Sequence, residues 1–192
     1  MQSEREKWNR KFSEGSPPAV EPDSFLIEAN AHYVAPAFFN GGRVLDIAGG
    51  LGRHALFYAR KGWQATLIDI SEVATQRVAE ISEKQKLSLT IYTADLDEFR
   101  WKQWREQFDL LLVFFYLQRQ LFPALIDLLH PGGLLVYKTH LRSETNSSSA
   151  ASSPQHVLEP CELQRAFAVM DILHYRERLN ERSTAELVAR KK

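Results

Sequence analysis

Residues 43–69 constrain the fold of this chain more than any other segment. A short apolar run at 44–47 predicts a buried strand, and the glycines at 49, 50 and 52 then allow a tight turn and a close approach of the backbone to a ligand. Small and apolar residues recur at helical spacing up to Gly62, a typical helix end. A second apolar run at 64–70 predicts another buried strand with Asp69 near its carboxyl end. This order of strand, glycine turn, helix and strand-end acid predicts a Rossmann-like βαβ unit for a nucleoside-containing ligand.

Two acids in this segment narrow the choice of ligand. Asp69 lies roughly twenty residues beyond the glycine turn, where such units place an acid that accepts hydrogen bonds from ribose hydroxyls; its alternative role is to cap the following helix. Asp46 would repel the pyrophosphate that dinucleotide-binding turns hold at a helix N-terminus. It suits a ligand with an ammonium group and no phosphate. Dinucleotide binding stays open as an alternative, since Gly50-x-Gly52-x-x-Ala55 fits that fingerprint.

The composition is that of an ordinary globular domain. Of 192 residues, 44% are hydrophobic and 25% are charged, and the length suits one domain over residues 1–192. The formal net charge is zero, so we expect no nucleic-acid or membrane partner. Cys161 is the single cysteine and the six histidines lack metal-ligand spacing, so we expect a cytoplasmic protein without a metal site. The longest apolar run, 110–117, is far shorter than the ~20 residues that span a bilayer.

Strands and helices alternate along most of the chain. Further strands are predicted at 89–96, 108–115 and 134–139, with helices between them. This alternation predicts an α/β fold with a mostly parallel sheet and right-handed crossovers. Residues 170–179 and 184–191 alternate apolar and polar side chains around a short polar turn, which predicts a terminal antiparallel hairpin. We expect residues 1–40 to form an N-terminal helical cap and the serine-rich residues 141–157 to form a flexible loop.

Local signals set three of the element boundaries. Ser71 is a suitable N-cap for the helix that follows the second strand. Pro131-Gly132-Gly133 predicts a turn before the strand at 134–139. Pro160 predicts the first position of a short helix, because proline tolerates that position best.

The segment Asp46-Ile-Ala-Gly-Gly-Leu-Gly resembles the Asp-x-Gly-x-Gly-x-Gly signature of class I S-adenosylmethionine-dependent methyltransferases, whose sheet also ends in an antiparallel hairpin. Ala48 replaces the first glycine, and its methyl group would crowd the cofactor if the position needs a positive φ. A finer resemblance is to small methyltransferases of the tellurite-resistance type. It rests on residues 8–12, on Gly52-Arg53-His54-Ala55-Leu56, on 116–119 with 121–123, and on 156–160 with 162–163. Such relatives often have Glu-Thr where this chain has Lys138-Thr139.

This resemblance implies methyl transfer to a small-molecule acceptor by in-line displacement. It implies S-adenosyl-L-methionine as the cofactor, bound by Asp46, Ala48, Gly49, Gly50, Gly52, Asp69, Ile70, Asp95, Leu96 and Phe114. It also suggests that the helix carrying Trp8 and Phe12 covers the cofactor. Two other functions stay open: a non-catalytic protein that binds the same cofactor, and a dinucleotide-dependent oxidoreductase.

Catalytic residues are harder to predict, because the cofactor carries the reactive group and the protein mainly aligns the reactants. Tyr116 and Arg119 follow the fourth predicted strand, at the carboxyl edge where α/β sheets bind ligands. Arginine presents a fork of donors that suits an oxyanion, although Arg119 on a helix surface would equally form a salt bridge. His140 follows the fifth strand and titrates near neutral pH; its alternative is a solvated loop histidine.

Overall fold

The computed structural model describes residues 3–14, 21–142, 156–179 and 183–192. They belong to two compact units, Met1–Arg100 (unit 1) and Trp101–Lys192 (unit 2). Of the serine-rich loop expected at 141–157, residues 143–155 lie outside the described part of the chain. Within the described ranges, no helix is long and apolar enough to cross a membrane.

Unit 1 is built on three parallel strands in the order β3-β2-β1. Their bounds are β1 (Arg43–Ile47), β2 (Gln64–Asp69) and β3 (Leu89–Thr93), and the connecting helices are α4 (Arg53–Arg60) and α5 (Glu72–Gln85). Apolar side chains of α4, β2 and α5 bury one another around Leu56, Leu67 and Val78. The predicted N-cap is confirmed, since the Ser71 Oγ accepts a hydrogen bond from the Ala74 amide at 3.2 Å. The predicted βαβ unit is therefore present.

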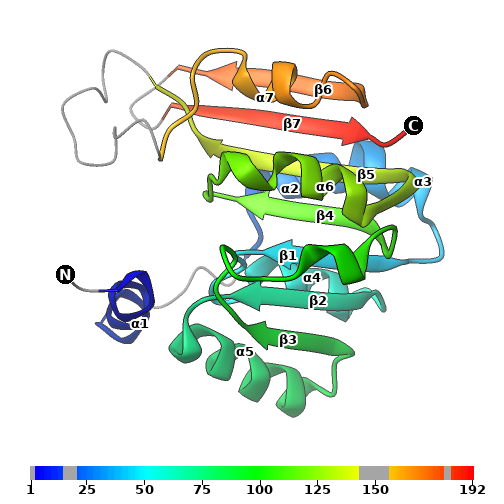
Figure 1. Ribbon diagram of the computed structural model, residues 1–192. Coiled ribbons are helices and arrows are strands. Elements are labelled where there is room, and N and C mark those ends of the chain that lie inside the picture. Colours follow the sequence, from blue (N-terminus) through cyan, green and yellow to red (C-terminus); the bar gives the residue numbers. More distant parts are fainter. Residues whose placement is uncertain (1–2, 15–20, 143–155, 180–182) are drawn as a thin grey trace. The chain divides into compact units, whose positions relative to one another are not determined.

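Helices precede β1 in the described part of residues 1–40. They are α1 (Glu4–Glu14), α2 (Ser24–Ala29), a π-helical turn (Asn30–Val34) and α3 (Ala35–Ala37). Helix α1 lies beyond the arrowheads of β1 and β2 in Figure 1 and packs against α5. An Arg5–Glu72 ion pair of 2.8 Å and a hydrogen bond from Arg77 to the Phe12 carbonyl hold it there.

Unit 2 contains four strands in the order β4-β5-β7-β6. The strands are β4 (Phe108–Phe114), β5 (Leu129–His140), β6 (Asp171–Arg178) and β7 (Thr184–Arg190), and the helices are η2 (Trp101–Trp104), η3 (Arg119–Leu121), α6 (Phe122–Leu128) and α7 (Glu162–Ala166). Strands β4 and β5 are parallel, whereas β7 runs antiparallel to both β5 and β6. The predicted mostly parallel α/β sheet with a terminal antiparallel hairpin is confirmed.

Three predicted boundaries are wrong. Strand β5 already begins at Leu129, and its pairing with β4 shifts register next to Phe108, so the Pro-Gly-Gly segment forms an irregularity within the strand. Strand β3 ends at Thr93 instead of continuing to residue 96. Helix α7 begins at Glu162, two residues after Pro160. For β5, pairing with β4 in the folded chain extended the strand beyond the turn that local composition predicted.

Candidate cofactor and acceptor sites

The glycine turn after β1 has three residues with left-handed backbone. Ala48 has a φ of 53°, Gly50 of 53° and Gly52 of 73°. At Gly52 a Cβ atom would lie 2.8 Å from a methyl carbon of Val78, so the turn packs directly on α5. At Gly49 a Cβ atom would lie 2.8 Å from Leu67. Glycine at these positions therefore allows a tight turn, while Ala48 adopts a conformation that costs an L-residue energy.

Asp69, at the end of β2, binds the glycine turn. Its Oδ2 accepts a hydrogen bond from the Gly50 amide at 2.8 Å, and its Oδ1 accepts one from the Ser71 amide at 2.9 Å. Burial raises the pKa of this carboxyl group, although the amide hydrogen bonds lower it again in part. Each carboxylate oxygen keeps acceptor capacity after one hydrogen bond. The bond from the Ser71 amide fits the alternative role of Asp69, which is to cap the start of α5. The carboxylate also keeps acceptor positions for ribose hydroxyls.

Asp46 lies under the same turn and is 1% exposed. Its Oδ2 accepts a hydrogen bond from the Ala55 amide at 3.1 Å. In the described part of the chain no hydrogen-bond donor reaches its Oδ1. Burial is the main reason that the pKa of Asp46 rises to about 7, and the negative charge of Asp69 raises it further. A buried carboxylate with one open oxygen suits a cationic group such as an ammonium ion.

His54 joins Asp46 to the start of α2. Its Nε2 accepts a hydrogen bond from the Asp23 amide at 3.3 Å, so the neutral ring carries its proton on Nδ1. That nitrogen lies 4.0 Å from the Asp46 Oδ1. Arg53 lies 3.9 Å from the Asp23 carboxylate. Arg53 and His54 both bind Asp23, the N-cap residue of α2, and so position the first turn of that helix.

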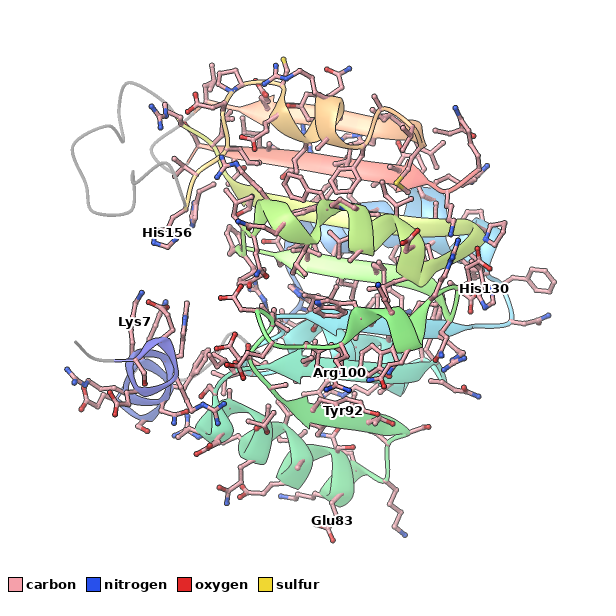
Figure 2. The ribbon with its side chains drawn as sticks, in the orientation of Figure 1. Lys7, Glu83, Tyr92, Arg100, His130 and His156 are labelled. Atoms are coloured by element: carbon pink, nitrogen blue, oxygen red, sulfur yellow. The ribbon has the colours of Figure 1, made fainter. Side chains whose placement is uncertain are left out.

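Aromatic residues of α1 lie on the glycine turn. A Cβ atom at Gly50 would lie 3.1 Å from the Phe12 ring, and Phe12 stacks on Trp8 with ring centroids 5.6 Å apart. The Asn9 Oδ1 accepts a hydrogen bond from the Ser71 hydroxyl at 2.7 Å, which fixes α1 at the start of α5. Figure 2, where Lys7 marks α1, shows this helix beside the carboxyl ends of the unit 1 strands.

The remaining predicted cofactor residues are placed as follows. Asp95 is half-buried, and its Oδ1 accepts a hydrogen bond from the Asp97 amide at 3.0 Å, so it also stabilises its own turn. Leu96 is buried beside it, and Ile70 is half-buried after β2. Phe114 is the last residue of β4, in unit 2, and is buried. Unit 1 therefore groups Asp46, the glycines and Asp69 through direct contacts. The cofactor roles of these residues and of Phe114 stay predictions.

In unit 2, Arg119 already binds a carboxylate of the protein. Its Nε donates to the Glu162 Oε1 at 2.6 Å, and its Nη2 donates to the Glu162 Oε2 at 2.9 Å and to the Val157 carbonyl at 3.0 Å. Burial would raise the pKa of Glu162, but these bonds hold it below its usual value. The geometry supports the salt-bridge alternative: Arg119 fixes the segment 157–162 to the start of α6.

The other two catalytic candidates have different surroundings. The Tyr116 hydroxyl donates to the Gln118 side chain at 2.8 Å, and the Tyr116 carbonyl accepts a hydrogen bond from the Tyr137 hydroxyl at 2.9 Å. The His140 ring lies against the ring of Phe115, with centroids 5.2 Å apart. Phe115 was not among the predicted site residues, although its place at the end of the apolar strand predicted at 108–115 was a usable signal. The Glu162 partner of Arg119 was not predicted either.

The comparisons with known proteins decide the family. The family model described as "Methyltransferase domain" matches residues 23–185, which is most of the chain and reaches into both units. The chain belongs to this methyltransferase family. No curated protein matches the methyltransferase by sequence. Groups of side chains that could hold a metal ion are absent from the residues that the structure describes.

Solved structures of similar fold include three of particular interest. TehB from Haemophilus influenzae is 17% identical, with 96% of this chain and 67% of that chain covered and a TM-score of 0.72. The N-methyltransferase NodS from Bradyrhizobium japonicum, in complex with S-adenosyl-L-homocysteine, is 18% identical, with 97% of both chains covered and a TM-score of 0.70. The [4+2]-cyclase SpnF is 17% identical, with 96% and 91% covered and a TM-score of 0.68. These likenesses establish the fold, which hosts more than one chemistry.

Proposed function

We propose that this methyltransferase uses S-adenosyl-L-methionine and transfers its methyl group to a small-molecule acceptor. The family match favours methyl transfer over the dinucleotide-dependent alternative. One observation carries the choice of cofactor: Asp46 is buried beneath the glycine turn, and within the described residues its Oδ1 receives no hydrogen bond. A pyrophosphate at that turn would meet a negative charge, whereas the ammonium group of the methionine moiety would be attracted.

The residues of unit 1 divide the work of binding. We assign the ribose hydroxyls to Asp69, which two backbone amides hold in a fixed orientation. The glycine turn lets the backbone approach the cofactor, and Phe12 on α1 excludes water from that turn. When bound, the cofactor supplies a methyl group activated by a sulfonium ion, so the protein's task is alignment.

Further parts of the proposal rest on less direct support. The family match across residues 23–185 supports a single methyltransferase domain over residues 1–192. The single cysteine, Cys161, is exposed and is not in a disulfide, which fits a reducing, cytoplasmic location. A small-molecule acceptor is supported by the similar 1,6-didemethyltoxoflavin-N1-methyltransferase from Burkholderia thailandensis, whose structure holds 1,6-didemethyltoxoflavin. The zero net charge supports the absence of nucleic-acid partners.

Calorimetry with S-adenosylhomocysteine tests the cofactor assignment. Asp69→Ala should lower the affinity roughly ten- to a hundredfold, because hydrogen bonds to a charged acceptor contribute about 1.5–3 kcal/mol. Glu83→Ala is the matched control, since it removes an exposed carboxylate from the far end of α5 (Figure 2) and should leave the affinity unchanged. Equal affinities of the two variants would refute the ribose assignment, and no binding to the unmodified protein would refute the cofactor.

Turnover needs a separate test, because SpnF shows that a cyclase shares this fold. We expect formation of S-adenosylhomocysteine with at least one member of a panel of small acceptors. Binding without turnover across such a panel would favour the non-catalytic alternative. A change in nicotinamide fluorescence on mixing with NADH would instead favour the dinucleotide alternative.

A further inference from the structure

Phe115, the residue directly after β4, has a strained backbone. Its φ is 57°, in the left-handed region that bulky residues rarely occupy. Its amide donates a hydrogen bond of 2.7 Å to the Lys138 carbonyl, so pairing with β5 holds this conformation. The side chain is nevertheless 40% exposed. Strain of this kind concentrates at ligand-binding positions, where it aims a side chain that the unstrained strand would place elsewhere.

Two basic side chains of β5 lie next to the Phe115 ring. The His140 ring is tilted by 45° against it, and the Lys138 Nζ lies 5.8 Å from its centroid. Phe115 follows the carboxyl end of β4, and Lys138 and His140 belong to the last three residues of β5. An aromatic face and two basic groups therefore meet at the carboxyl edge of the unit 2 sheet. His156 projects at this same edge in Figure 2.

A buried acid on β7 organises the cationic groups of this edge. Glu186 is 1% exposed and pairs with Lys138 at 3.2 Å, with Arg176 at 2.7 Å and with Arg178 at 3.1 Å. Lys138, Glu186 and Arg176 occupy one row across β5, β7 and β6. The Arg178 side chain is 46% exposed, so a ligand in solution can reach part of it. Glu186 thus holds three cations, among them Lys138, in fixed positions.

We propose that Phe115, Lys138, His140 and Arg178 form the subsite for the methyl acceptor, and that this acceptor is a small planar carboxylate. The proposal rests on the proposed function. The exposed aromatic face would stack on a flat ring. Three cations share the single carboxylate of Glu186, so the cluster keeps a net positive charge that would attract a carboxylate. A cationic acceptor would be repelled, and an inorganic oxyanion would leave the exposed part of the Phe115 ring uncovered. Arg119 is not part of this subsite, since its guanidinium group is paired one to one with the Glu162 carboxylate.

Titration with salicylate and with its neutral isostere salicylamide tests the proposal. Both probes are added to the full chain, with and without saturating S-adenosylhomocysteine, and binding is followed by ligand-observed NMR. We expect salicylate to bind at least about tenfold more tightly than salicylamide, because one charge-assisted interaction is worth about a factor of ten. Equal binding of the two probes, or no saturable binding of salicylate, would overturn the proposal.

Three variants and a control locate the binding surface. Lys138→Gln and Arg178→Gln should each weaken salicylate binding about five- to tenfold, and Arg178→Gln leaves the buried Glu186 with its two other partners. Phe115→Gly accommodates the positive φ and should weaken both probes. Lys192→Gln removes an exposed cation from the chain end beyond β7 and should change nothing. A loss with Lys192→Gln equal to that with Lys138→Gln would also overturn the proposal.

Affinity for S-adenosylhomocysteine separates this test from that of the proposed function. The affinity should be the same in all four variants. A protein that fails to bind S-adenosylhomocysteine refutes the proposed function, while the salicylate titration without it still reports on the subsite.

Discussion

Ala48→Gly should stabilise the fold. Ala48 stands where the family signature has glycine, and its φ of 53° is left-handed. That conformation costs an L-residue about 1–2 kcal/mol, which glycine does not incur. Glycine also makes the unfolded chain more flexible, and this effect offsets about 0.4–1 kcal/mol of the gain. The net increase in the free energy of unfolding is therefore between zero and about 1.6 kcal/mol, centred on about 0.8 kcal/mol, or roughly 2–3 °C in Tm at the centre of this range for a chain of this size.

Chemical and thermal unfolding of the cofactor-free protein, followed by circular dichroism, measures this difference. Ala79→Gly is the matched control, because Ala79 is an exposed residue in the middle of α5. The same chemical change there should destabilise the protein by about 1 kcal/mol, since glycine is a poor helix former. The two substitutions should thus have opposite signs. A destabilisation by Ala48→Gly as large as that by Ala79→Gly would refute the argument from backbone strain.

Two further predictions concern charged side chains. The pKa of the Asp46 carboxyl group rises from 3.8 to about 7 on folding, so the native state binds this proton more tightly than the unfolded state does. The resulting stabilisation is fully present below about pH 4 and is lost as the pH rises through 7. In urea unfolding, the stability of Asp46→Asn relative to the unmodified protein should increase as the pH is raised from 5 to 8. A difference in the free energy of unfolding that stays constant over this range would contradict the raised pKa. For Arg119 and Glu162, a double-mutant cycle with Arg119→Gln and Glu162→Gln should give a coupling of about 1 kcal/mol, and zero coupling would contradict the forked geometry.

The sequence by itself determined the βαβ unit, the glycine turn, Asp46, Asp69 and the terminal hairpin. Each of these depends on residues that are close together in the chain: apolar periodicity defines a strand, glycines define a turn, and an acid after a strand lies at its carboxyl end. The N-cap at Ser71 was predictable for the same reason, because its hydrogen bond reaches only three residues ahead.

The tertiary structure alone decided which side chains meet across long separations. For Arg119 the sequence left an acceptor role and a salt bridge both open. The folded chain pairs it with Glu162, 43 residues away, because folding brings the start of α7 to η3. Lys138 and Arg176 share Glu186 only because the register of β5, β7 and β6 places them in one row. The left-handed conformation of Phe115 is likewise set by its hydrogen bond to β5, since nothing in a phenylalanine favours that conformation. Local sequence predicts elements and their ends, whereas register and packing choose the partners of long charged and aromatic side chains.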